Sequence, residues 1–207
     1  MKLTIKMSLE ESQAWRPDLE GWSDDILPFY RALVKSLDTF GEAVEVGCYF
    51  GRSLCFLIDE LARELRSGWV TGIEPGKSDP LQQYEHGPEV GPGHNRNVLW
   101  DCREVLEQNL ERFSHSHAPI QTRIIRLPSL AASFTFDDHS LDLVFLDGDH
   151  REESVRADIE AWRPKIRPGG WLAGHDYGFH LYPGVRKVVD EIFPGAEIYG
   201  SCWAVQL

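Results

Sequence analysis

The chain has 207 residues, of which 42% are hydrophobic and 26% charged, values typical of a globular protein. This length predicts a single domain, residues 1–207, with a full-sized core. The formal net charge of −12 argues against a general nucleic-acid-binding protein, which needs a basic face, and against docking on anionic lipid. We therefore expect a small-molecule substrate, with no nucleic acid and no membrane among the partners.

The cysteines and the first residues narrow the class of protein further. The four cysteines lack the CxxC spacing of a zinc site and do not indicate a disulfide framework. Residues 1–11 contain no apolar run long enough for a signal peptide or a membrane helix. We expect a cytoplasmic protein.

The N-terminal part, residues 1–40, is predicted to be an arm followed by a helix. Residues 1–22 are polar and irregular, with Trp15 and Trp22 as candidate anchors on the domain or on its substrate cleft. Apolar residues then recur at helical spacing over Ile26–Leu37.

The next stretch has the order strand, helix, strand. Val44–Gly47 is predicted to be a short strand that ends in glycine, and a helical stripe of apolar side chains follows it as far as Leu65. Trp69–Glu74 is the second predicted strand. Such a unit requires a right-handed crossover and a parallel sheet.

Residues 76–96 interrupt this alternation with several prolines and glycines and no clear periodicity. A segment of this length without regular structure is usually functional or mobile. We predict a lid or substrate loop that is mobile in the free protein and becomes ordered when ligands bind.

The second half of the chain returns to alternating helices and strands, which predicts an α/β fold. The predicted strands are Thr122–Leu127, Leu141–Asp147 and, after a turn at Pro168-Gly169-Gly170, Trp171–Gly174. The predicted helices are Asn97–Phe113, Arg151–Trp162 and one that follows Pro183. Residues 196–205 have room for two short strands around Gly200, which predicts a closing hairpin.

The predicted strand Leu141–Asp147 carries the first candidate site. Its apolar run is typical of a strand buried on both faces, and it stops at Asp147, Gly148, Asp149 and His150. Ligands of open α/β sheets bind beyond the carboxyl ends of the strands, so functional polar groups are expected here. The alternative is a tight turn with the N-cap of the following helix, where Asp and Gly are also common.

Two other strand ends favour the functional interpretation. The first strand runs into a glycine turn with the spacing Gly47-x3-Gly51, which lets a ligand approach the backbone and a helix N-terminus. The second ends on Glu74, at the position where an acid commonly binds the ribose hydroxyls of a nucleoside cofactor. A solvated surface glutamate is the alternative for Glu74.

Together these features resemble the class I S-adenosylmethionine (SAM) dependent methyltransferases, and within them a small-molecule O-methyltransferase-like group with some metal-dependent members. The resemblance spans residues 43–193. The matching stretches are Val44–Gly47 with Gly51–Ser53, Glu74, Leu143–His150, Arg167–Gly170 with His175–Tyr177, and Pro183–Val185 with Val189.

The resemblance implies a Rossmann-like, mostly parallel sheet of seven strands with helices on both faces and the last strand antiparallel. SAM would lie across the strand ends, with Glu45 orienting its amino group, Glu74 holding the ribose and Ser129 near the adenine. The full set of implied cofactor-binding residues is Glu45, Gly47, Gly51, Ser53, Glu74, Ser129 and Asp147.

The resemblance also implies a site for one divalent ion, Mg²⁺ or Mn²⁺, held by Asp147, His175 and Asp176. The ion would bind the substrate oxygen and lower its pKa. His150, together with Asp147, is the candidate catalytic residue, because an imidazole that titrates near neutrality suits removal of the substrate proton. The alternatives are that His150 caps the next helix or binds Asp176 structurally, and that His175 hydrogen-bonds a core carbonyl.

The predicted function is SAM-dependent methyl transfer to a hydroxyl oxygen of a small molecule. One alternative is a metal-independent enzyme that methylates nitrogen or carbon. Another is a nucleotide-binding Rossmann-like module without catalysis. An NAD-dependent dehydrogenase is disfavoured because the G-x-G-x-x-G fingerprint is missing from the first strand end.

Overall fold

The computed structural model describes residues 3–16, 18–19, 21, 23–76, 102–114 and 119–207. In these ranges the helices are α1 (Leu9–Ala14), α2 (Ile26–Ser36), α3 (Arg52–Arg63), α5 (Arg103–Ser114), α6 (Ser129–Ser133), α7 (Glu152–Trp162) and α8 (Pro183–Ile192). The strands are β1 (Glu42–Val46), β2 (Gly68–Ile73), β3 (Ile120–Ile125), β4 (Leu141–Leu146), β5 (Ile166–Gly174), β6 (Glu197–Tyr199) and β7 (Cys202–Gln206).

The strands form one seven-stranded sheet in the order β3-β2-β1-β4-β5-β7-β6. The pairs among β1 to β5 are parallel, and β7 runs antiparallel to both β5 and β6. This confirms the predicted mostly parallel sheet with an antiparallel last strand and a closing hairpin around Gly200.

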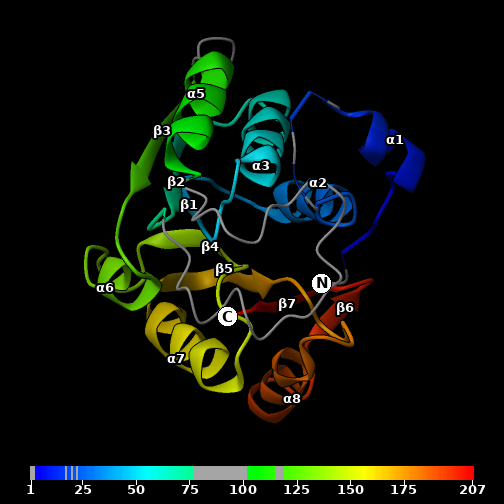
Figure 1. The fold of residues 1–207 in the computed structure, drawn as a ribbon, viewed down its shortest axis with the longest axis vertical. Helices are drawn as coiled ribbons and strands as arrows, with labels where there is room; N and C mark the ends of the chain where they lie inside the picture. Colours follow the sequence, from blue (N-terminus) through cyan, green and yellow to red (C-terminus); the bar gives the residue numbers. More distant parts are fainter. Residues whose placement is uncertain (1–2, 17, 20, 22, 77–101, 115–118) are drawn as a thin grey trace, which may run out of the picture.

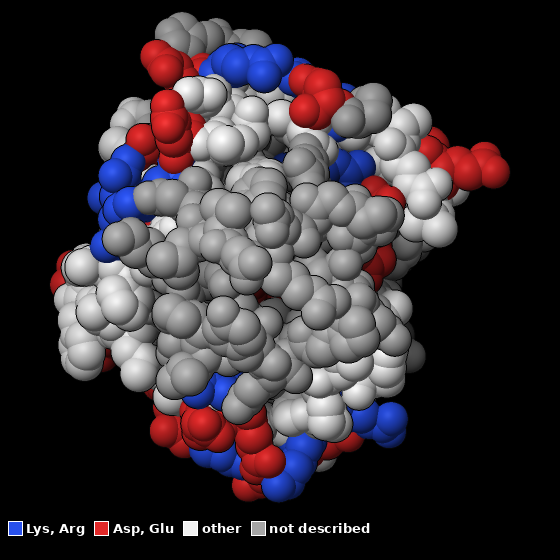
Figure 2. Space-filling view, viewed as in Figure 1, with Lys and Arg blue, Asp and Glu red and all other residues white. Residues whose placement is uncertain are grey.

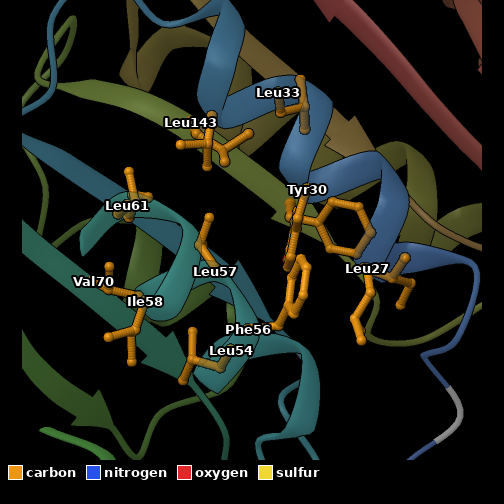
Figure 3. Close-up of a cluster of buried hydrophobic side chains, with 14 of the residues drawn as sticks. Leu27, Tyr30, Leu33, Leu54, Phe56, Leu57, Ile58, Leu61, Val70 and Leu143 are labelled. Atoms are coloured by element: carbon orange, nitrogen blue, oxygen red, sulfur yellow. The ribbon is translucent and has the colours of Figure 1, made fainter. Parts of the chain in front are cut away.

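Helices cover both faces of the sheet, as Figure 1 shows. Helices α2, α3 and α5 pack on one face, where Figure 3 shows side chains of α2 and α3 against Val70 and Leu143 of the sheet. Helices α6, α7 and α8 pack on the other face. All six residues of β4 are buried, because this central strand is covered on both sides.

The outer surfaces of α7 and α8 carry acids and bases in close alternation (Figure 2). Arg156 lies 2.7 Å from Glu191, and Lys187 lies 2.8 Å from Glu152, so the two helices are joined by ion pairs. Exposed pairs of this kind contribute little to stability. Among the described residues, no helix is both long and apolar enough to cross a membrane.

The N-terminal arm contains a helix that we did not predict. Helix α1 is closed by a capping box, in which the Ser8 hydroxyl accepts from the Glu11 amide and the Glu11 carboxylate accepts from the Ser8 amide. The spacing Ser-x-x-Glu is the known sequence signal for this motif and could have located the helix. Trp15 does anchor the arm, because its Nε1 donates to Asp59 at 3.1 Å and its ring packs edge-on against Phe56. Trp22 lies outside the described residues.

Strand β5 is longer than predicted. We expected Pro168-Gly169-Gly170 to form a turn before the strand, but β5 already begins at Ile166 and runs through these residues. The register against β4 shifts between Leu141 and Leu143, and Gly169 has a left-handed φ of +83°. A bulge thus absorbs the residues that we took for a turn.

Two other parts of the chain differ from the sequence predictions, either because the structure describes them only in part or because they were not predicted. The predicted lid of residues 76–96 lies outside the described residues apart from Gly76, and so does the start of the predicted helix Asn97–Phe113. Helix α6, which immediately follows Pro128, was not predicted; its five residues are too few for a visible helical period.

Candidate active site at the carboxyl ends of the strands

The parallel register brings three strand ends to one edge of the sheet. Val46 of β1 pairs with Leu146 of β4, which pairs in turn with Gly174 of β5. The residues that follow these strands are therefore neighbours: Asp147 donates its amide to the Val46 carbonyl, and His175 donates its amide to the Leu146 carbonyl. The predicted convergence of strand ends is confirmed.

The turn after β1 requires glycine at both predicted positions. Gly47 has a φ of +83°, and a Cβ atom there would lie 2.0 Å from the carbonyl oxygen of Asp147. Gly51 has a φ of +85° and occupies the N-cap of α3 without a side chain to cap the helix. The first amide groups of α3 can therefore bind an anionic group such as a carboxylate.

Replacing Gly47 by alanine should cost at least about 3 kcal/mol of stability, because backbone strain and a steric clash add together. Gly178 is a matched control: its φ is +79°, yet a Cβ atom there would meet nothing within 4 Å. Gly178→Ala should therefore cost only about 1 kcal/mol. Urea denaturation of both variants checks this, and equal losses would show that the contact with Asp147 is easily relieved.

Glu45 lies beneath this turn and is 1% exposed. Its carboxylate accepts hydrogen bonds from the hydroxyls of Tyr30 at 2.6 Å and Ser53 at 2.7 Å. Burial raises the pKa of Glu45 to about 8; these two hydrogen bonds oppose the shift, and the negative charge of Asp147 adds to it. Tyr30 was predicted only as part of an apolar helix face, because nothing in the sequence shows that its hydroxyl reaches Glu45.

Glu74, which directly follows β2, forms hydrogen bonds with the backbone of the same turn. One carboxylate oxygen accepts from the amides of Cys48 at 3.2 Å and Tyr49 at 3.1 Å, and the other accepts from the amide of Gly76 at 2.9 Å. A carboxylate has about four acceptor positions, so these bonds leave capacity for a ligand hydroxyl. The role of Glu74 in ribose binding stays a prediction.

Ser129, the first residue of α6, is bonded to helix α7. Its hydroxyl donates to Asp158 at 2.6 Å and accepts from the Trp162 indole at 2.9 Å. Burial raises the pKa of Asp158 to about 6, although the hydrogen bond from Ser129 lowers it. Asp158 also lines a small cavity of about 20 Å³ beside Asp147 and His150. The adenine-binding role of Ser129 stays a prediction, and Asp158 was not foreseen.

The ends of β4 and β5 place two carboxylates and two imidazoles together. His175 Nδ1 lies 3.5 Å from Asp147 Oδ1 and 3.4 Å from Asp176 Oδ2. His150 Nε2 lies 2.7 Å from Asp176 Oδ2 and 3.8 Å from Asp147 Oδ1. This nitrogen atom is buried, and its geometry to the carboxylates is not that of a hydrogen bond. Asp176 has a φ of +58°, which is unusual for a residue other than glycine and typical of strained functional positions.

The charges in this cluster depend on one another. Burial lowers the pKa of His150, but the carboxylates of Asp147 and Asp176 outweigh it and raise the value to about 9. Burial also lowers the pKa of His175, but the neighbouring carboxylates outweigh it, so the net pKa is raised. For Asp176, burial raises the pKa, but the two histidines lower it to well below its usual range. Without another cation, the histidines therefore neutralise the carboxylates.

The structure argues against two of the alternative roles for the histidines, helix capping by His150 and a core carbonyl partner for His175. His150 is not the N-cap of α7, because that position belongs to Arg151, whose side chain makes no capping hydrogen bond. Asp149 accepts from the Arg151 amide at 3.0 Å and from the Ser154 hydroxyl at 2.6 Å. His150 points to the cluster instead, and its ring stacks on Tyr182 at a centroid distance of 4.0 Å. In the part of the chain that the structure describes, the ring of His175 hydrogen-bonds with side chains and with no core carbonyl.

The partners of His175 are Asp25 and Ser201, neither of which was predicted. Asp25 Oδ2 lies 3.0 Å from His175 Nε2, and the Ser201 hydroxyl donates to the same Asp25 oxygen and lies 3.0 Å from Nε2. Burial raises the pKa of Asp25, but hydrogen bonds from His175 and Ser201 outweigh it, and the net pKa is lowered. Asp25 is therefore an ionised acceptor.

The donor atoms of Asp147, His175 and Asp176 fit a divalent ion. All three lie within 4.8 Å of one another. Ligands that hold an ion at about 2.1 Å are themselves roughly 3 to 3.5 Å apart, which matches the distances from His175 Nδ1 to both carboxylates. The spacing of the donors is therefore compatible with one shared ion.

A second group of donors, Asp25, His175 and Cys202, is equally compact but fits an ion less well. Burial raises the pKa of the Cys202 thiol well above its ordinary value. Cysteine binds metal as the thiolate, so a thiol that stays protonated is a poor ligand. The predicted set is the better candidate.

Comparisons with known proteins agree with this geometry. Residues 44–177 match a family model described as a methyltransferase domain. A curated relative from Sinorhizobium fredii, the uncharacterized protein y4gI, is 30% identical over 134 residues, which are 64% of this chain but only 13% of that protein.

Solved structures share the fold at low sequence identity. The O-methyltransferase NovP superimposes with a TM-score of 0.65 at 21% identity, over 88% of this chain and 79% of that one. An O-methyltransferase from Bacillus cereus, solved with S-adenosylhomocysteine (SAH), gives 0.56 at 18% identity, over 96% and 90% of the two chains. The chain therefore belongs to the methyltransferase-domain family and has the fold of the class I SAM-dependent methyltransferases.

Proposed function

We propose that this chain transfers the methyl group of SAM to a hydroxyl oxygen of a small molecule, with the help of one divalent metal ion. The observation that carries the proposal is the convergence of Asp147, His175 and Asp176 at strand ends directly beside the turn from Gly47 to Gly51. A candidate cofactor-binding turn and a candidate metal site thereby share one edge of the sheet.

SAM supplies a methyl group activated by its sulfonium, and the protein supplies binding and orientation. The amide groups at the start of α3 would bind the carboxylate of the methionine portion. Glu45 would accept a hydrogen bond from the amino group of the methionine portion. The positive charge of this amino group would favour the ionised form of the buried acid. Glu74 would accept a hydrogen bond from a ribose hydroxyl, and Ser129 would lie near the adenine.

A divalent ion held by Asp147, His175 and Asp176 would bind the acceptor oxygen and lower the pKa of its proton. Two carboxylates favour Mg²⁺, whereas the imidazole ligand favours Mn²⁺ or another transition metal. His150 could then accept the proton: its pKa of about 9 comes from the two carboxylates, and a cation bound to both of them would reduce that shift.

A second candidate function is methyl transfer without a metal. It is favoured by the ion pair of 2.7 Å between His150 and Asp176, because protonated histidines already balance the carboxylates in the metal-free protein. In that case His150 and His175 are structural cations, and the acceptor could be a nitrogen or a carbon that needs no base.

The cofactor is tested first. SAM or SAH at 100 times its Kd should stabilise the protein by about 2.7 kcal/mol and raise Tm by roughly 5 to 10 °C, while NAD should have no effect. Glu74→Ala should weaken SAM binding at least about tenfold in calorimetric titration, since the ribose loses its acceptor.

Glu64→Ala is the matched control, because Glu64 is an exposed acid at the end of α3. The Glu64→Ala variant should bind SAM with the same affinity as the unaltered protein. If Glu74→Ala binds SAM with unchanged affinity, the cofactor does not lie over this strand end, and if neither SAM nor SAH raises Tm, the proposed function itself is wrong.

A further inference from the structure

We propose that Asp25 is a positioning residue that turns the Nδ1 atom of His175 toward the metal ion. The inference rests on the proposed metal site and adds to it a residue from the N-terminal part of the chain. Asp25 directly precedes α2, and 150 positions separate it from His175 in the sequence.

The hydrogen bonds around Nε2 of His175 define which ring nitrogen carries the proton. An ionised carboxylate can only accept, so the contact of 3.0 Å with Asp25 requires a proton on Nε2. The Ser201 hydroxyl gives its own proton to Asp25, so its oxygen can only accept from Nε2 as well. In the neutral imidazole, Nδ1 then presents its lone pair.

That lone pair is on the ring nitrogen that lies beside the two proposed carboxylate ligands of the ion. Nδ1 lies 3.4 to 3.5 Å from the nearest oxygens of Asp176 and Asp147, too far for a good hydrogen bond but suitable for a shared ion. A histidine that binds metal usually donates its other N–H to a carboxylate, which sets the tautomer and the ring orientation. The order Asp25, His175, ion reproduces this arrangement.

The neighbouring residue Asp24 offers a matched control for Asp25. Asp24 forms an ion pair of 2.6 Å with Arg52, whose guanidinium is buried and also donates to the carbonyls of Ser12 and Trp15. These carbonyl bonds, and a further bond from Arg52 to the Ser23 hydroxyl, do not depend on Asp24. Asp24 does not contact His175 in the described structure, so it provides a control with the same charge at nearly the same place.

The test is the affinity for Mn²⁺, measured by isothermal titration calorimetry on the full chain. Asp25→Asn should weaken Mn²⁺ binding by 10- to 100-fold, as is usual for the loss of an outer partner of a ligand. Asp24→Asn should change it less than about threefold. Ser201→Ala, which removes a donor to Asp25, should weaken binding by less than Asp25→Asn does.

A double-mutant cycle separates positioning from charge. If Asp25 acts through His175, Asp25→Asn should have no further effect on Mn²⁺ affinity in a His175→Ala background. Pulsed electron paramagnetic resonance of bound Mn²⁺ should show coupling to a ¹⁴N nucleus in the unaltered protein, and this signal should vanish in His175→Ala. Unchanged SAM affinity in each variant verifies that it is folded.

The outcomes distinguish this inference from the proposed function. Three results would each overturn the role of Asp25 and leave the metal site standing: an unchanged Mn²⁺ affinity in Asp25→Asn, equal losses of affinity in Asp24→Asn and Asp25→Asn, or additive losses in the cycle. No Mn²⁺ binding by the unaltered protein would overturn both the metal site and the inference.

Discussion

Removal of divalent ions with EDTA should abolish methyl transfer, and added Mg²⁺ or Mn²⁺ should restore it, while the Kd for SAM changes no more than a few-fold. The reason is that the proposed metal ligands follow β4 and β5, whereas most of the proposed SAM contacts follow β1 and β2. Turnover with and without the metal, alongside calorimetric titration of SAM, measures the two effects separately.

Asp176→Asn should lower kcat at least about 100-fold and leave SAM affinity nearly unchanged, because it removes one charged ligand of the ion. Asp138→Asn is the control, since Asp138 is an exposed acid paired with Lys165. His150→Ala should lower turnover most near neutral pH, and added metal should not rescue it. Full activity in EDTA by protein shown to be free of metal would establish the metal-independent alternative, with His150 and His175 as the balancing cations.

Glu45→Gln should make the SAM-free protein more stable at pH 8.5 and weaken SAM binding at least about tenfold. The pKa of about 8 in the folded protein lies above the ordinary value of 4.5. The stability that comes from the protonated acid is therefore fully present below pH 4.5 and is lost as the pH rises through 8. Glutamine stays neutral, so the variant avoids a loss of the order of a few kcal/mol.

Urea denaturation at pH 5 and pH 8.5 measures this effect, with Glu64→Gln as an exposed control that should show no such dependence. The free energies of unfolding of the Glu45→Gln variant and the unaltered protein should be similar at pH 5 and diverge at pH 8.5. A difference that is the same at both pH values would mean that Glu45 is already ionised in the free protein. Unchanged SAM affinity would remove Glu45 from the cofactor site.

The pattern of the sequence was enough to predict a parallel α/β sheet and the edge at which the candidate site lies, whereas the seven strands and the antiparallel last strand were implied by the resemblance to the methyltransferases. Each strand is a local apolar run, and the glycines and acids that end these runs are adjacent to them in the chain. Once strands and helices alternate, the parallel crossover rule leaves few topologies, so Gly47, Asp147 and His175 had to meet at one edge.

Local pattern failed where a longer-range contact overrides it. Pro168-Gly169-Gly170 has the composition of a turn, but pairing with β4 and a bulge keep it within β5. Helix α6 is too short for periodicity to reveal. In β5 the tertiary environment, rather than intrinsic preference, decides the backbone conformation.

The second layer of the site was decided by the tertiary structure. Tyr30 reads as one more apolar position of a helix, and Asp25 and Ser201 read as ordinary polar residues, yet they bond Glu45 and His175 from 15, 150 and 26 positions away. A strand end fixes the direction of its own residues through the local backbone. Which distant side chain meets them depends on how the arm, α2 and the final hairpin pack on the sheet, and that information exists only in the folded chain.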